Sequence, residues 1–434
     1  MPHMFTRRSF LNRGLAGLSV ASTMPLFLQR TVMAINNPAG AAPTAKNEEI
    51  LVVLQLSGGN DGLSMVVPVE NDDYRKARNA TAILNPLILQ KGADVGLNPN
   101  LVGFKDIFDD GHLALMQGIG YPNPNRSHFR SMEIWQTAEP VKPPVDGWLG
   151  RYFDAQCGGS DPKNPVKAAD AKPLDPKAAI NIGNLAPLAL HGSKFSAVSF
   201  QNPNAYQWFA GNRVDPKMRK TFDDINQFDN PEATGSSGNP TLDFLERTAL
   251  DAQLTSDEIR NVTTKYKSGV AYPASQLAQQ LQMVAQMIAG GLSTRVYYVS
   301  MGGFDTHSNQ RAQHDRLMTE LSNAVGAFMK DLKAQGNFDR TLLMTFSEFG
   351  RRVTENASRG TDHGTAAPMF VMGGKVKAGI IGALPSLSPA ELDKGDLKFH
   401  TDFRSVYATI LDQWLKADSK AILGAGFKNL PILA

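Results

Sequence analysis

The chain has 434 residues, with 44 basic and 41 acidic side chains and 38 glycines. This length is enough for one large α/β domain with ample core, or for two ordinary domains. The charge is nearly balanced and no basic cluster is interleaved with aromatic residues, so we expect no nucleic-acid partner. Cys157 is the only cysteine, which excludes a disulfide within these residues and leaves stability to the core.

Residues 1–34 are predicted to be a twin-arginine signal peptide. Arg7 and Arg8 precede aromatic and aliphatic residues, a modest apolar stretch, and small residues that suit a signal peptidase. We therefore expect the twin-arginine translocase as a partner during export and a periplasmic or extracellular location. The apolar stretch is too short and interrupted for a stable membrane span. The alternative is an amphipathic helix. Residues 35–48 are predicted to be a linker.

A central parallel strand is predicted at residues 50–56, where the run is continuously apolar. It leads into a glycine-rich loop that carries Asp61. The loop lacks the Gly-Lys-Ser/Thr of a phosphate-binding loop. Asp61 nevertheless stands at the carboxyl end of a strand, where open α/β sheets bind ligands. The alternative is a simple Asn-Asp-Gly turn.

The next segments predict a helix at 100–109, a strand at 112–117, and a helix at 129–136 after a polar loop. Ser127 would lie near the N-terminus of the last helix. There the backbone N–H groups and the helix dipole lower the cost of a developing anion, which makes Ser127 a candidate nucleophile. Its commoner role is that of an N-cap.

Residues 140–240 are rich in Pro, Lys, Gly and Ser, and contain a short strand pattern at 178–182. We expect a loop-rich cap or insertion over the sheet here. Residues 49–434 would then form a single domain.

The remaining chain alternates between apolar runs of strand length and runs with helical spacing. Strands are predicted at 295–300, 341–346 and 368–372, and helices at 275–290, 311–334 and 402–415. The alternation predicts an α/β fold with a mainly parallel central sheet, helices on both faces, and one site at the carboxyl edge.

Two loops place an Asp close to a His beside glycines. Asp305 and His307 follow the strand at 295–300, and Asp362 and His363 lie further on. Carboxylate oxygen and imidazole nitrogen presented to one point suit a zinc-like ion. One such pair alone would be interpreted as polar loop residues that cap helices. Two pairs, with Asp61, favour a metal site.

Several motifs together resemble the exported bacterial family known as domain of unknown function 1501. Besides the leader, they are Leu54–Gly62, Gly303–His307, Ser347–Arg351, Thr361–Gly364 and Thr401–Arg404. That family is similar to the alkaline phosphatase superfamily, which includes sulfatases. The segment Thr361–Gly364 resembles the Asp-His-Gly metal motif of that superfamily.

The resemblance implies two divalent ions. The ligands implied for the first ion are Asp61, Asp362 and His363. Those implied for the second are Asp305 and His307, with a further group that is His400, His314 or the oxygen ligand Glu348. The single residue between Asp305 and His307 departs from the superfamily, which commonly places three there. Zinc or manganese fits these ligands better than magnesium or calcium.

Two ions could activate a hydroxyl and stabilise the attacking and leaving oxygens of a phosphoryl or sulfuryl transfer. Arg351 or Arg126 could clamp the substrate, although a surface salt bridge explains either residue. We therefore expect a metal-dependent hydrolase of phosphate or sulfate esters, acting on a small molecule or a glycan through the hydroxyl of Ser127.

Two alternatives stay open. The same fold could serve a non-catalytic envelope protein that binds a ligand or metal without turnover. A serine hydrolase using Ser347 or Ser57 with His363 is disfavoured, because neither serine stands in a Gly-x-Ser-x-Gly frame.

Overall fold

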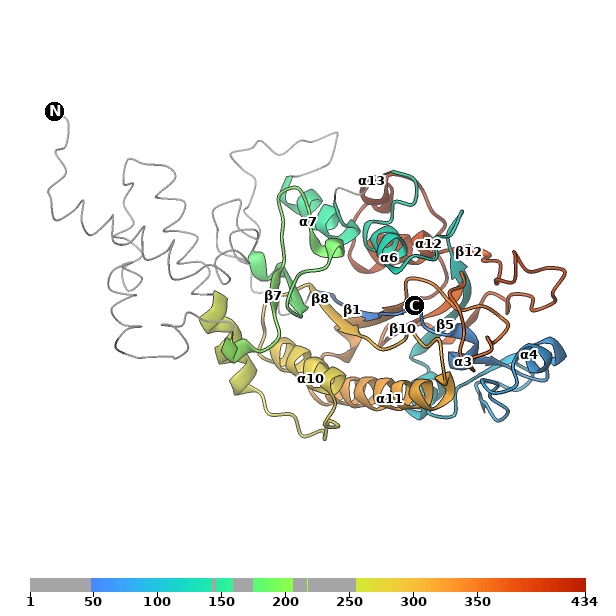
Figure 1. Cartoon of the computed structure of the whole chain (residues 1–434). Helices are drawn as coiled ribbons and strands as arrows, with labels where there is room; N and C mark the ends of the chain where they lie inside the picture. Colours follow the sequence, from blue (N-terminus) through green and yellow to red (C-terminus); the bar gives the residue numbers. More distant parts are fainter. Residues whose placement is uncertain (1–47, 143–145, 159–174, 206–216, 218–254) are drawn as a thin grey trace, which may run out of the picture.

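The computed structural model describes residues 48–142, 146–158, 175–205, 217 and 255–434 (Figure 1). The predicted signal peptide with Arg7 and Arg8, nearly all of the predicted linker, and much of the region 140–240 lie outside the described residues. In the part of the chain that is described, no helix combines the length and apolar character needed to cross a membrane.

A large mixed sheet forms the centre of the described structure and has β1 in its middle. Its order is β11-β5-β10-β9-β1-β8-β6-β7, and β12 pairs with β5. Only β10 runs antiparallel to its neighbours, β9 and β5; the other pairs among these strands are parallel. The strands are β1 (Ile50–Leu56), β5 (Leu113–Gly120), β6 (Ala179–Ile182), β7 (Val198–Phe200), β8 (Val296–Met301), β9 (Thr341–Phe346), β10 (Ala367–Gly373), β11 (Gly379–Ile381) and β12 (Thr401–Asp402). The prediction of a mainly parallel α/β sheet is confirmed.

Strand β1 shows why the sequence has a continuous apolar run. All of its residues are buried. Val52 and Leu54 point into the core on one face of the sheet, while Leu51 and Val53 point into the core on the other. A strand covered on both faces has no solvent side, so six of its seven residues are apolar, and the exception, Gln55, lies next to its carboxyl end.

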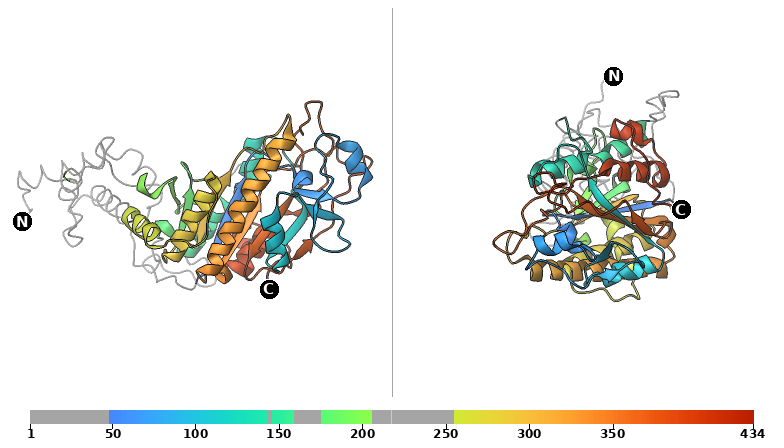
Figure 2. Two further views of the ribbon diagram at one scale, coloured as in Figure 1. Left: turned by 90° about the horizontal axis from the view of Figure 1, so that it is seen from below. Right: turned by 90° about the vertical axis from the view of Figure 1, so that its right-hand side faces the viewer.

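Helices cover both faces of the sheet (Figures 1 and 2). The core on one face includes residues of α5 (Val102–Asp109), α10 (Gln276–Ala289) and α11 (Gln310–Ala334). The core on the other face includes residues of α6 (His128–Thr137), α7 (Trp148–Gly158), α12 (Phe403–Thr409) and α13 (Ser419–Leu423). A π-helical turn, Ile410–Trp414, continues α12, so the helix predicted at 402–415 is divided in two.

The described part of the predicted insertion adds strands to the sheet. Strand β6 pairs with β8, and β7 pairs with β6, both in parallel register. Short 3₁₀ helices accompany these strands and β9 at Pro176–Ala178, Leu188–Leu190, Pro203–Ala205 and Phe338–Arg340. Residues 179–200 therefore extend one edge of the sheet.

A smaller unit follows β1; its helices α3 and α4 are labelled in Figure 1. Its three-stranded antiparallel sheet has the order β2-β4-β3. The elements are α3 (Gly62–Met65), β2 (Val66–Pro68), α4 (Asp72–Ala77), β3 (Leu87–Ile88) and β4 (Val95–Leu97). A separate apolar cluster, which includes Leu63, Tyr74 and Val353, joins this unit to the loop after β9.

The sheet order decides which loops meet. Strands β8, β1 and β9 are parallel neighbours, and β5 has the same direction as β9 because both are antiparallel to β10. The loops after these strands therefore leave from the same edge of the sheet, where doubly wound folds bind ligands.

Candidate metal centre

The structure brings Asp305, His307 and His363 together at this edge. Nε2 of His307 lies 3.0 Å from Oδ1 of Asp305 and 3.0 Å from Nε2 of His363. Nε2 of His363 lies 3.3 Å from the same oxygen of Asp305. His128 closes the group, with Nε2 3.5 Å from Oδ2 of Asp305. We call these residues the His/Asp cluster.

Three loops supply the cluster. Asp305 and His307 lie between β8 and α11, and His128 is the first residue of α6, after β5. His363 lies on the connection from β9 to β10, where it forms an isolated antiparallel bridge with Arg351. Each of these side chains thus lies on a segment that directly follows or connects strands of the sheet.

Two glycines permit the close approach of these loops. A Cβ at Gly360 would lie 2.2 Å from the carbonyl carbon of His307. A Cβ at Gly58, whose φ is +120°, would lie 2.5 Å from the backbone nitrogen of Asp305. Because backbone atoms occupy this space, a side chain at either position would push the cluster apart.

In each histidine of the cluster, Nδ1 faces an oxygen acceptor. Nδ1 of His128 lies 2.7 Å from a Glu348 carboxylate oxygen, and Nδ1 of His307 lies 3.2 Å from Asp362. Nδ1 of His363 lies 2.8 Å from the Arg126 carbonyl oxygen. A carbonyl or carboxylate can only accept, so in a neutral ring Nδ1 carries the proton and Nε2 keeps a lone pair that can bind an ion.

The Nε2 lone pairs of the three histidines therefore gather around the Asp305 carboxylate. Arg351 places one positive charge at the edge of this group, 2.6 Å from Asp305 and 3.5 Å from Nε2 of His307, and a metal ion would place a second among the lone pairs. A histidine that binds a metal typically donates its other N–H to a carboxylate or a carbonyl, which is the arrangement of all three rings. Nε2 of His128 is buried and has no hydrogen-bond partner among the described residues.

The protonation states suit a cation. Partial burial raises the pKa of Asp305, but hydrogen bonding and charge attraction from Arg351 outweigh it and lower the pKa to about 2. Partial burial lowers the pKa of His363, in spite of its bond to the Arg126 carbonyl. At neutral pH the site thus offers an ionised carboxylate and a neutral imidazole.

The donor set and spacing fit zinc. In a tetrahedral zinc site with bonds of about 2.0–2.1 Å, neighbouring ligand atoms lie about 3.3 Å apart. The atoms of Asp305, His307 and His363 lie 3.0–3.3 Å apart. Imidazole nitrogen with one carboxylate favours zinc or a similar transition metal over calcium and magnesium, which prefer oxygen. The side chains of Asp305 and His307 are 48% and 45% exposed, so the site is open to a substrate.

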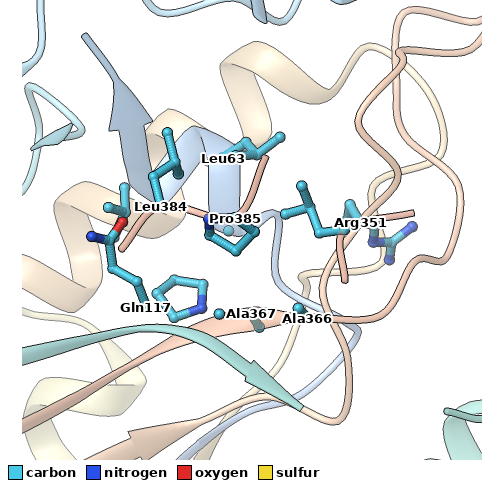
Figure 3. Close-up of a pocket in the computed structure, with 12 residues that line it drawn as sticks. Leu63, Gln117, Arg351, Ala366, Ala367, Leu384 and Pro385 are labelled. Atoms are coloured by element: carbon cyan, nitrogen blue, oxygen red, sulfur yellow. The ribbon is translucent and has the colours of Figure 1, made fainter. Parts of the chain in front are cut away.

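Arg351 positions Asp305 and has no free face for a substrate. Its guanidinium is buried and donates to the carbonyl oxygens of Gly58, Gly59 and Thr361 and, at 2.6 Å, to Asp305. Its aliphatic part borders an apolar pocket, while the guanidinium points away from that pocket (Figure 3). The substrate clamp expected at Arg351 is therefore not available. The other expected clamp, Arg126, pairs with Asp396.

Asp61 lies in a buried ion pair. Arg78 donates to both of its carboxylate oxygens at 2.5 and 2.9 Å, and both side chains are fully buried. Burial alone would raise the pKa of Asp61, but the guanidinium outweighs it and holds the pKa below its usual range. Ser64 and Gln310 donate to the same carboxylate. With these partners, Asp61 is placed to support the fold and not to bind an ion.

Gln310 links this ion pair to the cluster. Its amide nitrogen donates to Asp61, and its amide oxygen accepts from Thr306 at 3.0 Å and from Thr361 at 2.6 Å. Thr306 stands between Asp305 and His307, and Thr361 stands two residues before His363. The Asp61 network therefore holds the two principal cluster loops in place.

The other expected ligands lie around the cluster or away from it. Glu348 and Asp362 support histidines, as described above. His314 is buried, bonds to Asn60, and has a pKa lowered to about 4 by burial. His400 bonds to Thr401 and to the carbonyl of Ala383. Among the described residues, one group of possible metal ligands has all its ligand atoms within 4.8 Å of one another, namely His128, Asp305 and His363, where the resemblance implied two ions.

Ser127 stands between His128, a member of the cluster, and Arg126, whose carbonyl oxygen contacts His363 of the cluster. It occupies the N-cap position of α6, but its side chain makes no cap hydrogen bond. The sequence analysis singled out Ser127 and overlooked His128 as a ligand. The sequence position of His128 could have identified it as a possible ligand, because it lies after a buried strand, β5, just as Asp305 lies after β8.

The fold and the site together define an α/β protein with an exposed His/Asp cluster at the carboxyl edge of its sheet. The profile of the family described as protein of unknown function (DUF1501) matches residues 115–423, which is more than half of the chain. The chain therefore belongs to this family, as its motifs predicted. No curated protein matches it.

Solved structures similar to the chain include three from bacteria. A protein in the alkaline phosphatase superfamily from Vibrio parahaemolyticus has 10% identity, with 96% of this chain and 76% of that chain covered and a TM-score of 0.33. The PsFucS1 sulfatase from Pseudoalteromonas sp. has 11% identity, 92% and 72% coverage, and a TM-score of 0.35. Alkaline phosphatase from the Antarctic bacterium TAB5 has 11% identity, 75% and 92% coverage, and a TM-score of 0.29. Likeness at this level does not assign a reaction or substrate to this chain.

Proposed function

We propose that the His/Asp cluster binds one divalent ion, preferably zinc, and that the protein hydrolyses phosphate or sulfate esters. The observation that carries the proposal is the gathering of three Nε2 lone pairs around Asp305, with each Nδ1 tied to an oxygen. Structural zinc sites are closed by protein, whereas catalytic ones keep a position open. The exposure of Asp305 and His307 supports the second kind.

The residues have distinct parts in this proposal. Asp305, His307 and His363 would hold the ion, which leaves its fourth position open beside His128, and Arg351 orients Asp305 through its hydrogen bond. A divalent ion bound there would act as a Lewis acid on an ester oxygen and lower the pKa of a nearby hydroxyl. Ser127 lies between Arg126 and His128, which both contact other members of the cluster, and its hydroxyl would be the nucleophile.

Metal analysis and an ester screen test the proposal. The purified chain should contain about one zinc per molecule, and removing it with EDTA should abolish turnover of an aryl phosphate, an aryl phosphodiester or an aryl sulfate. Adding zinc back should restore the turnover. If zinc binds but none of these esters is cleaved, a binding role replaces hydrolysis. If no transition metal binds, the metal centre itself is wrong.

Replacing Ser127 with alanine should separate nucleophile from ligand. We expect turnover to fall by at least about 1,000-fold, the scale seen when a nucleophile is removed. Zinc content should stay unchanged, because Ser127 is not part of the cluster. The free energy of unfolding should barely change, since the serine makes no cap hydrogen bond.

The control is Ser386→Ala, at another exposed serine, which should leave turnover unchanged. Kinetics of both variants on the ester that the parent cleaves best provide the measurement. Full activity in Ser127→Ala would mean that a different nucleophile attacks.

A further inference from the structure

An open pocket of about 420 Å³ lies directly beside the His/Asp cluster. His128 and Asp305 line it, so anything bound there would be next to the proposed ion. One face of α6, from His128 to Gln136, forms one wall, Gln55 comes from the end of β1, and Glu348 comes from the loop after β9. The pocket is therefore continuous with the proposed reaction site, and the chemistry of its walls indicates what part of a substrate it accepts.

Phe129 gives the pocket an aromatic face. It follows His128 directly, lines the pocket, and is 87% exposed. A single exposed apolar residue is ordinary on a protein surface. Here the exposed ring lines a pocket beside a cluster of possible metal ligands, where a flat substrate group could cover it.

Two amides supply hydrogen-bonding groups in fixed orientations. The Tyr298 hydroxyl donates to Oε1 of Gln55 at 2.5 Å, and Nε2 of Gln136 donates to the same oxygen at 3.2 Å. These bonds leave Nε2 of Gln55 as a donor and Oε1 of Gln136 as an acceptor, neither with a partner among the described residues. Both side chains are more than nine-tenths buried and line the pocket.

The charges around the pocket exclude an anionic occupant. None of the residues that line it is Lys or Arg, whereas Asp305, Glu133 and Glu348 are among them. A phosphate or sulfate group would be repelled from this wall. The pocket therefore suits the neutral part of an ester.

We propose that this pocket is the subsite for the alcohol part of the ester, and that this part is a neutral ring carrying hydroxyl groups, such as a pyranose. The ring would stack on Phe129, and its hydroxyls would bond to Gln55 and Gln136. Aromatic stacking with paired amides satisfies both the apolar face and the polar edge of such a ring. The inference rests on the proposed function for the identity of the bound molecule as an ester.

A binding experiment tests the subsite without turnover. Saturation-transfer NMR with methyl β-D-glucopyranoside and methyl β-D-galactopyranoside should show binding of at least one of them to the full chain. Phe129→Ala should weaken that binding roughly 3- to 10-fold, which is the expected size of one lost aromatic contact. Phe129→Tyr should retain it. Leu84→Ala, at an apolar residue that is 70% exposed and does not line the pocket, should have no effect.

Kinetics then distinguish the two proposals. On a pyranose sulfate or phosphate, Phe129→Ala should lower kcat/KM by a similar factor, with no change on methyl phosphate or methyl sulfate. Pyranoside binding that depends on Phe129, without hydrolysis of any ester, would overturn the proposed function and keep the subsite. Two outcomes would overturn the subsite and keep the function. In the first, the protein hydrolyses esters but binds neither pyranoside. In the second, Phe129→Ala changes neither the binding of the pyranoside nor kcat/KM.

Discussion

His363→Ala is expected to remove most of the zinc from the purified protein. The change takes away one of the nitrogen atoms of the cluster and leaves the Asp305 carboxylate with fewer partners for an ion. Loss of a group that merely supports a ligand weakens metal binding by about 10–100-fold, so loss of a ligand should weaken it by more than about 100-fold. Ester turnover should fall to the level of the EDTA-treated parent. Elemental analysis and a competition titration with a chromophoric chelator measure the effect.

His400→Ala is the matched control for this experiment. His400 is an exposed histidine directly before β12, and its ring bonds to Thr401 and to the carbonyl oxygen of Ala383, not to the cluster. We expect its zinc content and turnover to equal those of the parent. Equal zinc content in His363→Ala and the parent would contradict the metal centre. Zinc loss in His400→Ala would instead restore His400 to the ligand set.

Asp61→Ala is expected to lower the free energy of unfolding by about 3–5 kcal/mol, the usual cost of removing one partner from a buried ion pair. The change leaves the fully buried guanidinium of Arg78 without its counter-ion. It also releases Gln310 from its bond to the carboxylate. Because Gln310 connects the loops of Asp305 and His363 through Thr306 and Thr361, we expect a moderate loss of zinc affinity as a secondary effect.

Urea unfolding with and without zinc measures this prediction. Asp109→Ala, which removes an exposed pair with Lys105, should cost only about 0–1 kcal/mol. The double variant Asp61→Ala/Arg78→Met should recover much of the lost stability, because no buried charge is left unpaired. A change below about 1 kcal/mol in Asp61→Ala, together with complete loss of zinc, would show that Asp61 is a ligand after all.

The sequence by itself determined the strands and helices of the core. The apolar run at 50–56 and the one at 341–346 became β1 and β9 with the same bounds. The helix predicted at 275–290 became α10, which Ser275 caps by accepting from the backbone N–H of Ala278. These features are local, because a strand buried on both faces is mostly apolar and a helix needs an apolar stripe and a cap.

The sequence also indicated which loops carry the site. Parallel strands end at the same edge, so Asp305 and His307 after one strand, and His363 in a loop after another, could be predicted to be near each other. The residue types pointed to a metal ion, since carboxylate and imidazole are its usual ligands.

Only the tertiary structure decided the role of each candidate. The sequence shows Asp61 at a strand end but not that Arg78 folds back to neutralise it, because that pairing depends on the path of a separate small sheet. It shows His128 beside Ser127 but not that β5 has the same direction as β9, which places this histidine at the cluster. The Nδ1 partners Glu348, Asp362 and the Arg126 carbonyl likewise come from long-range contacts. Local pattern specifies which residue types stand at strand ends, whereas strand order and long-range hydrogen bonds specify which of them face one another.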